Sequence, residues 1–165
     1  MLRFYSISSG SSGNAAFVKF KNTKILIDCG ISAKRMNLAL NELGESNVDA
    51  ILITHEHSDH IKGAGIFSRK YNVPIYAKAK TWQAMRRELG KLSENNIKII
   101  NDNIFTLGDF TVCSYSIPHD AADPVAYTFS ACDKKISVAT DIGCVTEEIY
   151  KNVIGSDIAL IESNH

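Results

Sequence analysis

Three histidines and one aspartate fall within six consecutive residues of this 165-residue chain. They form the run His-x-His-x-Asp-His, made by His55, His57, Asp59 and His60, directly after an apolar segment at residues 48–53. Imidazole nitrogens and carboxylate oxygens are donors that zinc takes in proteins, and core packing does not require so many of them together. The run therefore predicts a metal site. The alternative is a solvated, histidine-rich loop without a ligand role.

The spacing of the run suggests more than one cation. If the chain stays extended after residue 53, side chains two positions apart project to the same side, so His55 and His57 can bind one metal together. Asp59 and His60 fall where the pattern turns helical, over residues 60–71, and can reach the same hollow from another direction. The run contains no thiolate, so it favours zinc and leaves manganese and iron as alternatives.

The elements that must position these residues alternate between strands and helices. Strand-like segments at 2–7, 15–20 and 24–28, separated by a Gly-Ser loop and an Asn-Thr turn, predict an antiparallel meander. Apolar spacing predicts helices at 33–43 with Ser32 as cap, after His60, from a Thr81 cap to residue 92, and at 146–153. Further strands are expected at 48–53, 73–77, 97–100, 111–117, 125–131, 135–140 and 157–161. This alternation predicts an α/β fold layered as helix, sheet, sheet, helix.

Several motifs, in this order, resemble those of the metallo-β-lactamase superfamily. They are Asp28-Cys29-Gly30, the run from His55 to His60, a lone His119, and Thr140-Asp141-Ile142-Gly143. Four strings resemble the nuclease-like YycJ/WalJ subgroup, and these are Ser9-Gly10-Ser11-Ser12-Gly13-Asn14, Pro118-His119-Asp120-Ala121, again Thr140-Asp141-Ile142-Gly143, and Glu162-Ser163-Asn164-His165. The resemblance implies a four-layer αββα sandwich and a single domain over residues 1–165. It also implies that the C-terminal part of that domain is missing.

The resemblance further implies a dinuclear site for two divalent metal ions, with zinc favoured. The implied ligands are His55, His57, Asp59, His60, His119 and Asp141. Without the resemblance, a lone histidine such as His119 is more often a surface or core residue than a ligand.

Asp28 and Asp141 each stand at the end of an apolar strand, and we expect them to have different roles. A carboxylate oxygen of Asp141 could bridge both cations and let them share a hydroxide. Asp28 is expected to accept a hydrogen bond from the far ring nitrogen of a ligating histidine, and a plain turn aspartate before Gly30 is the alternative. The role of Glu162, at the end of another strand, stays open.

Asp59 and His165 are the candidate catalytic residues. His165 is interpreted as a proton donor or substrate contact, and the alternatives are the last ligand of the second metal or no role. Ser58 has no dedicated base beside it and is interpreted as a helix cap.

Composition limits the classes of partner. Eighteen basic and eighteen acidic residues give a net charge of zero, so no global electrostatic argument favours nucleic acid. Four cysteines without a C-x-x-C pair, at 29, 113, 132 and 144, predict buried free thiols in a reducing cytoplasm. An apolar run of about 18 residues, as a membrane span needs, is absent from the sequence.

The predicted function is metal-dependent hydrolysis, foremost of phosphodiester bonds in DNA or RNA by an exonuclease. The alternatives are a thioester or lactam hydrolase of the same fold and a non-catalytic metal-binding module. Lys78, Lys80, Arg86, Arg87 and Lys91 gather near one helix and could follow a nucleic-acid backbone, although such a charge run is more often a solvated helix face. The loop at residues 8–14 could cradle a phosphate, but a simple hairpin turn is the commoner structure.

Overall fold

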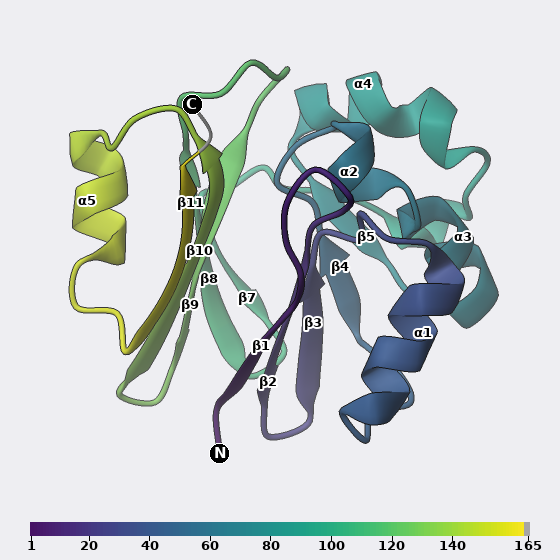
Figure 1. The fold of residues 1–165 in the computed structure, drawn as a ribbon, viewed down its shortest axis with the longest axis horizontal. Coiled ribbons are helices and arrows are strands. Elements are labelled where there is room, and N and C mark those ends of the chain that lie inside the picture. The colour runs from purple at the N-terminus through teal and green to yellow at the C-terminus, as the bar shows by residue number, and fades with distance from the viewer. Residues whose placement is uncertain (164–165) are drawn as a thin grey trace.

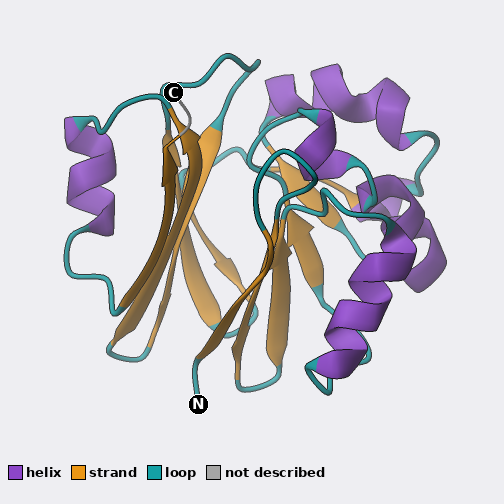
Figure 2. Ribbon diagram, in the orientation of Figure 1, coloured by secondary structure: helices purple, strands orange, loops and turns teal. Residues whose placement is uncertain are grey.

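Two β-sheets pack face to face, and helices cover both outer surfaces (Figures 1 and 2). This computed structural model describes residues 1–163. The expected α/β fold, layered as helix, sheet, sheet, helix, is confirmed. Within the described residues, no helix has both the length and the apolar character needed to cross a bilayer.

The first sheet begins with the expected antiparallel meander. Its strands are β1 (Arg3–Ser8), β2 (Ala15–Phe20) and β3 (Thr23–Ile27). The next three strands are β4 (Ala50–Leu52), β5 (Ile75–Ala77) and β6 (Ile97–Ile99), and they continue the sheet in parallel from β3. Parallel neighbours bring their carboxyl ends to one edge, so the loops after β3 and β4 meet there.

The second sheet has the order β11-β10-β9-β8-β7. Its strands are β7 (Ile104–Leu107), β8 (Phe110–Ser116), β9 (Val125–Ala131), β10 (Lys134–Ile142) and β11 (Ile158–Ser163). Neighbouring strands are antiparallel except for the parallel pair of β10 and β11. Strand β7 has four residues, is partly exposed, and is not among the strands expected from the sequence.

Four helices cover the first sheet and one covers the second (Figure 1). They are α1 (Ala33–Glu42), α2 (Ser58–Ile61), α3 (Ala64–Tyr71), α4 (Ala79–Leu89) and α5 (Glu147–Val153). A short 3₁₀ turn, η1 (Glu94–Asn96), precedes β6. Ser32 caps α1 as expected, because its hydroxyl accepts a hydrogen bond from the backbone N–H of Arg35.

Three predictions about these helices are wrong. The single helix expected after His60 is broken at Gly63, whose backbone N–H donates to the carbonyl of Cys29. Ser58 lies inside the first turn of α2, and the cap position belongs to His57. Thr81 lies inside α4, and its hydroxyl donates to the carbonyl of Asp123 instead of capping the helix. Tertiary contacts therefore override the local capping signals.

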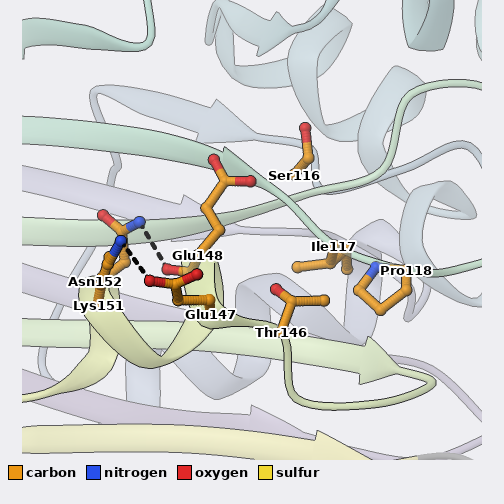
Figure 3. Close-up of a pocket in the computed structure, with 8 residues that line it drawn as sticks. All are labelled: Ser116, Ile117, Pro118, Thr146, Glu147, Glu148, Lys151 and Asn152. Carbon is orange, nitrogen blue, oxygen red and sulfur yellow. Dashed lines mark hydrogen bonds and ion pairs between the residues drawn. The ribbon is translucent and has the colours of Figure 1, made fainter.

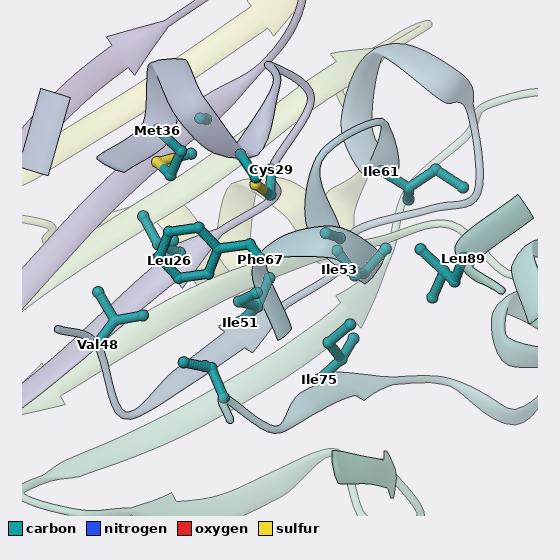
Figure 4. Close-up of a cluster of buried hydrophobic side chains, with 14 of the residues drawn as sticks. Leu26, Cys29, Met36, Val48, Ile51, Ile53, Ile61, Phe67, Ile75 and Leu89 are labelled. Carbon is teal, nitrogen blue, oxygen red and sulfur yellow. The ribbon is translucent and has the colours of Figure 1, made fainter. Parts of the chain in front are cut away.

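Three apolar clusters hold the four layers together. The first, between the outer helices and the first sheet, includes Leu26, Ile51 and Phe67 (Figure 4). The second lies between the two sheets and includes Ile25 and Phe129. Side chains alternate between the two faces of a strand, so adjacent residues such as Ile25 and Leu26 enter different clusters. Both faces of β3 are buried over its last three residues, which explains why these are Ile25, Leu26 and Ile27.

The third cluster joins the second sheet to α5. Its members include Tyr115 of β8, Ala139 of β10 and Ile149 of α5. All four cysteines are free thiols, but the prediction that they are buried holds only in part: Cys29 is buried, and Cys132 and Cys144 are exposed.

The buried thiol of Cys29 gives the fold a pH dependence. Burial, assisted by the negative charge of Asp28, raises the pKa of Cys29 from 9.0 to about 12. Above pH 9 the unfolded chain therefore releases this proton while the folded chain keeps it, so stability falls as the pH rises. Between pH 9 and 10 the chain should lose up to about 1.4 kcal/mol more unfolding free energy than Cys29→Ala does. Urea unfolding at each pH measures the difference, and parallel pH profiles would contradict the prediction.

Candidate metal centre

The predicted site residues that the structure describes lie at one edge of both sheets, in loops, in the first turn of α2 and at the end of β10. His55, His57 and the first turn of α2 follow β4, and Asp28 follows β3. The loop at residues 117–124 joins β8 to β9 and carries His119. Its Pro118 carbonyl accepts a hydrogen bond from the N–H of Gly143, which brings this loop to the end of β10.

A first cluster of donors consists of three histidines. One ring nitrogen of each of His55, His57 and His119 lies within 4.8 Å of the others. Nδ1 of His57 is 3.1 Å from Nε2 of His55 and 3.1 Å from Nε2 of His119. A neutral imidazole has one N–H and one lone pair, so three converging ring nitrogens cannot satisfy one another fully. A shared cation would satisfy all three, so this donor set fits a divalent metal ion.

A second cluster shares one residue with the first. It contains His55, His60 and Asp141, whose donor atoms also lie within 4.8 Å of one another. Nε2 of His60 is 2.6 Å from Oδ2 of Asp141, and Nε2 of His55 is 3.8 Å from the same oxygen. Asp59 lies at the margin of this cluster, with Oδ2 3.7 Å from Nε2 of His60. The two clusters meet at the fully buried His55.

Asp28 orients two of these histidines. Its Oδ2 lies 2.7 Å from Nδ1 of His60 and also accepts a hydrogen bond from the hydroxyl of Thr54 at 2.8 Å. Because the only hydroxyl hydrogen of Thr54 is used there, Thr54 can only accept from Nδ1 of His55, 3.0 Å away. Both Nδ1 atoms therefore act as donors, and Nε2 of each ring faces the cluster. Thr54 was not identified from the sequence, since a threonine after a strand carries no distinctive signal.

Two of the site aspartates have an uncommon backbone conformation. Asp28 has a φ of 60° and Asp141 a φ of 56°, in the left-handed region that costs energy for residues other than glycine. The pairing of β10 with β11 shifts register between Ala139 and Ile142, which marks a bulge around Asp141. Asp141 thus lies inside the end of β10 rather than after it, and the bulge turns its carboxylate toward the histidines.

Gly30 brings three segments into close contact. A Cβ placed on it would lie 1.6 Å from the carbonyl oxygen of Asp59 and 2.6 Å from the backbone nitrogen of Asn14. The N–H of Gly30 donates to the carbonyl of Asn14, and the N–H of Asn14 donates to that of Asp59. The absence of a side chain at Gly30 therefore lets the Gly-Ser loop approach the histidine run.

Asn14 is a site residue whose role the sequence did not reveal. Its Nδ2 lies 3.1 Å from Oδ2 of Asp59 and 3.0 Å from Nε2 of His60, and the residue is buried. Its Oδ1 accepts from the N–H of Gly10, so the Gly-Ser loop folds back on itself as a turn. The available signal was an asparagine between this loop and a buried strand, which does not specify a partner 45 residues away.

Removing the Asn14 amide should weaken metal binding. Residues that orient ligands typically contribute about 10- to 100-fold to metal affinity. We expect Asn14→Ala to lower affinity for the second bound Zn²⁺ or Mn²⁺ by a factor in that range, because Asp59 loses the donor that holds it. Metal titration by calorimetry measures the effect. Ser12→Ala, an exposed change in the same loop, is the matched control, and equal affinities for the two variants would contradict the role of Asn14.

The electrostatics of the cluster divide the histidines into two kinds. Burial, followed by the charges of neighbouring histidines, lowers the pKa of His55 to about 2, so its ring is neutral and has a lone pair for a cation. For His60, burial acts to lower the pKa, but the carboxylates of Asp28 and Asp141 outweigh it and raise the pKa to about 10. The hydrogen bond with His60 lowers the pKa of Asp141 to about 2. A cation at His60 must therefore displace a proton.

A separate hollow of about 620 Å³ lies behind the His119 loop, between the end of β8 and α5 (Figure 3). Its lining includes Pro118, Thr146 and Glu148, and neither donor cluster opens into it. Glu162 lines a different, smaller cavity beside Asp28 and Thr140. His165 lies outside the described residues.

Comparison with known proteins agrees with this geometry. The model of the metallo-beta-lactamase superfamily matches residues 9–146. This chain belongs to the metallo-β-lactamase superfamily. Membership implies bound divalent metal ions, and the two overlapping donor clusters fit them.

Among curated proteins, the relatives that match almost the whole chain include two named exodeoxyribonucleases. Exodeoxyribonuclease YycJ of Bacillus anthracis is 39% identical over 99% of the chain, and exodeoxyribonuclease WalJ of Streptococcus pneumoniae is 42% identical over 98%. The chain spans 63% and 62% of the lengths of these relatives. The resemblance to the YycJ/WalJ subgroup seen in the motifs is thus confirmed across the chain.

Solved structures support the fold. The metallo-β-lactamase fold protein YhfI of Bacillus subtilis superposes with a TM-score of 0.75 over 96% of this chain and 70% of its own, at 14% identity. PqqB of Methylobacterium extorquens, solved with Zn²⁺, gives a TM-score of 0.74 over 90% of this chain and 59% of its own, at 17% identity.

Proposed function

We propose that residues 1–165 form one metal-dependent hydrolase domain that cleaves phosphodiester bonds of nucleic acid as an exonuclease. The observation that carries the proposal is the pair of donor clusters that share His55. The identity to proteins named exodeoxyribonucleases supports nucleic acid as the substrate.

The proposed ligands divide between two metal positions. His55, His57 and His119 would hold the first ion, Asp59 and His60 would hold the second, and Asp141 would serve both positions. Metal ions bound there would lower the pKa of a shared water and neutralise the charge of a phosphodiester. Zinc suits this set of nitrogen and oxygen donors best, and manganese or iron are the alternatives. We place the protein in the cytoplasm, where four free thiols are compatible with the reducing environment.

The residues around the metal positions prepare them for this chemistry. Asp28 holds Nδ1 of His60 directly and Nδ1 of His55 through Thr54, so both rings present Nε2 to the site. The Asn14 amide donates to Asp59 and fixes the orientation of that carboxylate. His55 and His60 are fully buried, which keeps water away from their far sides and strengthens the electrostatic contacts.

A substrate comparison tests the proposal. The protein, supplied with Zn²⁺ or Mn²⁺, is assayed on bis-p-nitrophenyl phosphate, nitrocefin and a thioester, and then on end-labelled DNA and RNA oligonucleotides. We expect release of p-nitrophenol and a ladder of products that begins at one end of the oligonucleotide. His57→Ala should abolish both activities and reduce the metal content. Turnover of nitrocefin or the thioester alone would overturn the phosphodiesterase assignment, and bound metal without any turnover would indicate a non-catalytic module.

A further inference from the structure

The charges of this chain are segregated along the sequence although they sum to zero. Residues 62–91 contain eight of the 18 basic residues but one of the 18 acidic residues, Glu88. This segment therefore has a formal charge of +7, and the rest of the chain has −7. The segment comprises α3, strand β5 of the first sheet, and α4, and both helices lie on the outer side of that sheet (Figure 1).

Five of the eight cations are exposed and also lack an interaction partner within the described residues. Among the residues that the structure describes, none of the eight forms a salt bridge. Arg69 and Lys78 donate hydrogen bonds to a carbonyl and to an amide, and Lys70 lies over the ring of Tyr71. Within residues 1–163, the exposed cations of this segment that have no hydrogen-bond, ion-pair or ring partner are Lys62, Lys80, Arg86, Arg87 and Lys91. Their charges are therefore available to a ligand.

Helix α4 arranges these charges in a line that leads to the metal centre. Lys80 and Arg87 are seven positions apart, about 10.5 Å along one helix face, and Lys91 follows beyond the last turn. The first turn of α4 touches the His119 loop, since the hydroxyl of Thr81 donates to the carbonyl of Asp123 at 3.2 Å. The amino end of α4 lies next to this loop in Figure 1. Of these three cations, Lys80 in the first turn of α4 is thus nearest the site, and Lys91, beyond the end of the helix, is the most distant.

A groove runs beside this line, and its walls include apolar side chains, the cations of Arg86, Arg87 and Lys91, and one carboxylate, that of Glu94. It comprises two adjoining hollows of about 440 and 310 Å³ that share Trp82, Arg86 and Ile97. Ile99, which also lines it, is 50% exposed. A ligand with anionic and flat apolar parts matches such a surface, and a single nucleic-acid strand has both.

We propose that the outer face of α4, defined by Lys80, Arg86, Arg87 and Lys91, binds the phosphate backbone of a nucleic-acid strand and leads it to the metal centre. This inference rests on the proposed nuclease function and adds the path of the substrate. The lack of ion-pair partners and the contact with the His119 loop distinguish this face from an ordinary solvated helix surface.

Strand binding without cleavage tests the surface. Fluorescence anisotropy is measured with a labelled single-stranded DNA 20-mer in EDTA, over a range of salt concentrations. Lys80→Glu with Arg87→Glu should weaken binding about tenfold at low salt and reduce the slope of log K against log salt by about 1.4, or 0.7 for each lost phosphate contact. The matched control is Lys34→Glu with Arg35→Glu, which reverses two exposed charges on α1 and should leave binding unchanged.

Hydrolysis of bis-p-nitrophenyl phosphate separates this inference from the proposed function. The small substrate does not need the α4 face, so the Lys80→Glu, Arg87→Glu variant should hydrolyse it at the wild-type rate, which also shows that the variant is folded. If the protein binds the oligonucleotide but hydrolyses neither substrate, the nuclease proposal is wrong and the α4 face is still supported as a nucleic-acid-binding surface. The surface assignment would be overturned if the wild-type protein did not bind the oligonucleotide. It would also be overturned if the double variants on α4 and on α1 lost the same amount of binding affinity.

Discussion

Asp141→Asn should reduce phosphodiester hydrolysis by about 1000-fold. The change keeps the shape of the side chain but removes the negative charge that faces both His55 and His60. A ligand that contacts two cations contributes several kcal/mol to the reaction, and about 4 kcal/mol corresponds to this factor. The metal content should also fall below two ions per chain, because only Asp59 and His60 of the proposed ligands would then remain at the second metal position.

The measurements are p-nitrophenol release and elemental analysis of the purified variant. The control is Asp133→Asn, a change at an exposed position in the turn before β10. Its rate of p-nitrophenol release and its metal content should equal those of the wild-type protein. Full metal content together with wild-type turnover in Asp141→Asn would show that this carboxylate does not bridge the ions.

Gly30→Ala should destabilise the fold by about 3 kcal/mol or more and abolish metal binding. The added methyl group would lie 1.6 Å from the carbonyl oxygen of Asp59, so the backbone must move by more than an ordinary side-chain adjustment allows. Such a movement breaks the hydrogen bonds that join Asn14 to Gly30 and to Asp59. Because Asp59 and His60 are adjacent, the displacement reaches both donor groups of the second metal position.

Gly155→Ala separates this steric effect from the ordinary cost of replacing glycine. Gly155 has a φ of 76° and open space where the methyl group would lie, so its replacement should cost only about 1 kcal/mol. Urea unfolding and metal titration compare the two variants. A Gly30→Ala protein as stable as Gly155→Ala, with normal metal affinity, would contradict the role assigned to this contact.

The layer order and most strands could be predicted because both depend on local apolar periodicity. Strand β9, for instance, begins and ends where the sequence predicts, since its alternation is uninterrupted. The errors fall where a side chain has a distant partner. Thr81 has the sequence features of a cap, yet its hydroxyl bonds to Asp123, 42 residues later. Likewise, the helix after His60 breaks at Gly63, where the backbone contacts Cys29.

The sequence by itself determined the chemical class of the site. Imidazole and carboxylate donors, with His55 and His57 two residues apart, indicate metal binding whatever the rest of the fold is. Only the tertiary structure decided how the donors combine. It made His55 common to both clusters, made Asp28 the acceptor for His60 and Thr54, and brought Asn14 against Asp59. The physical reason is that such contacts depend on the packing of segments far apart in the chain, which residue spacing does not encode.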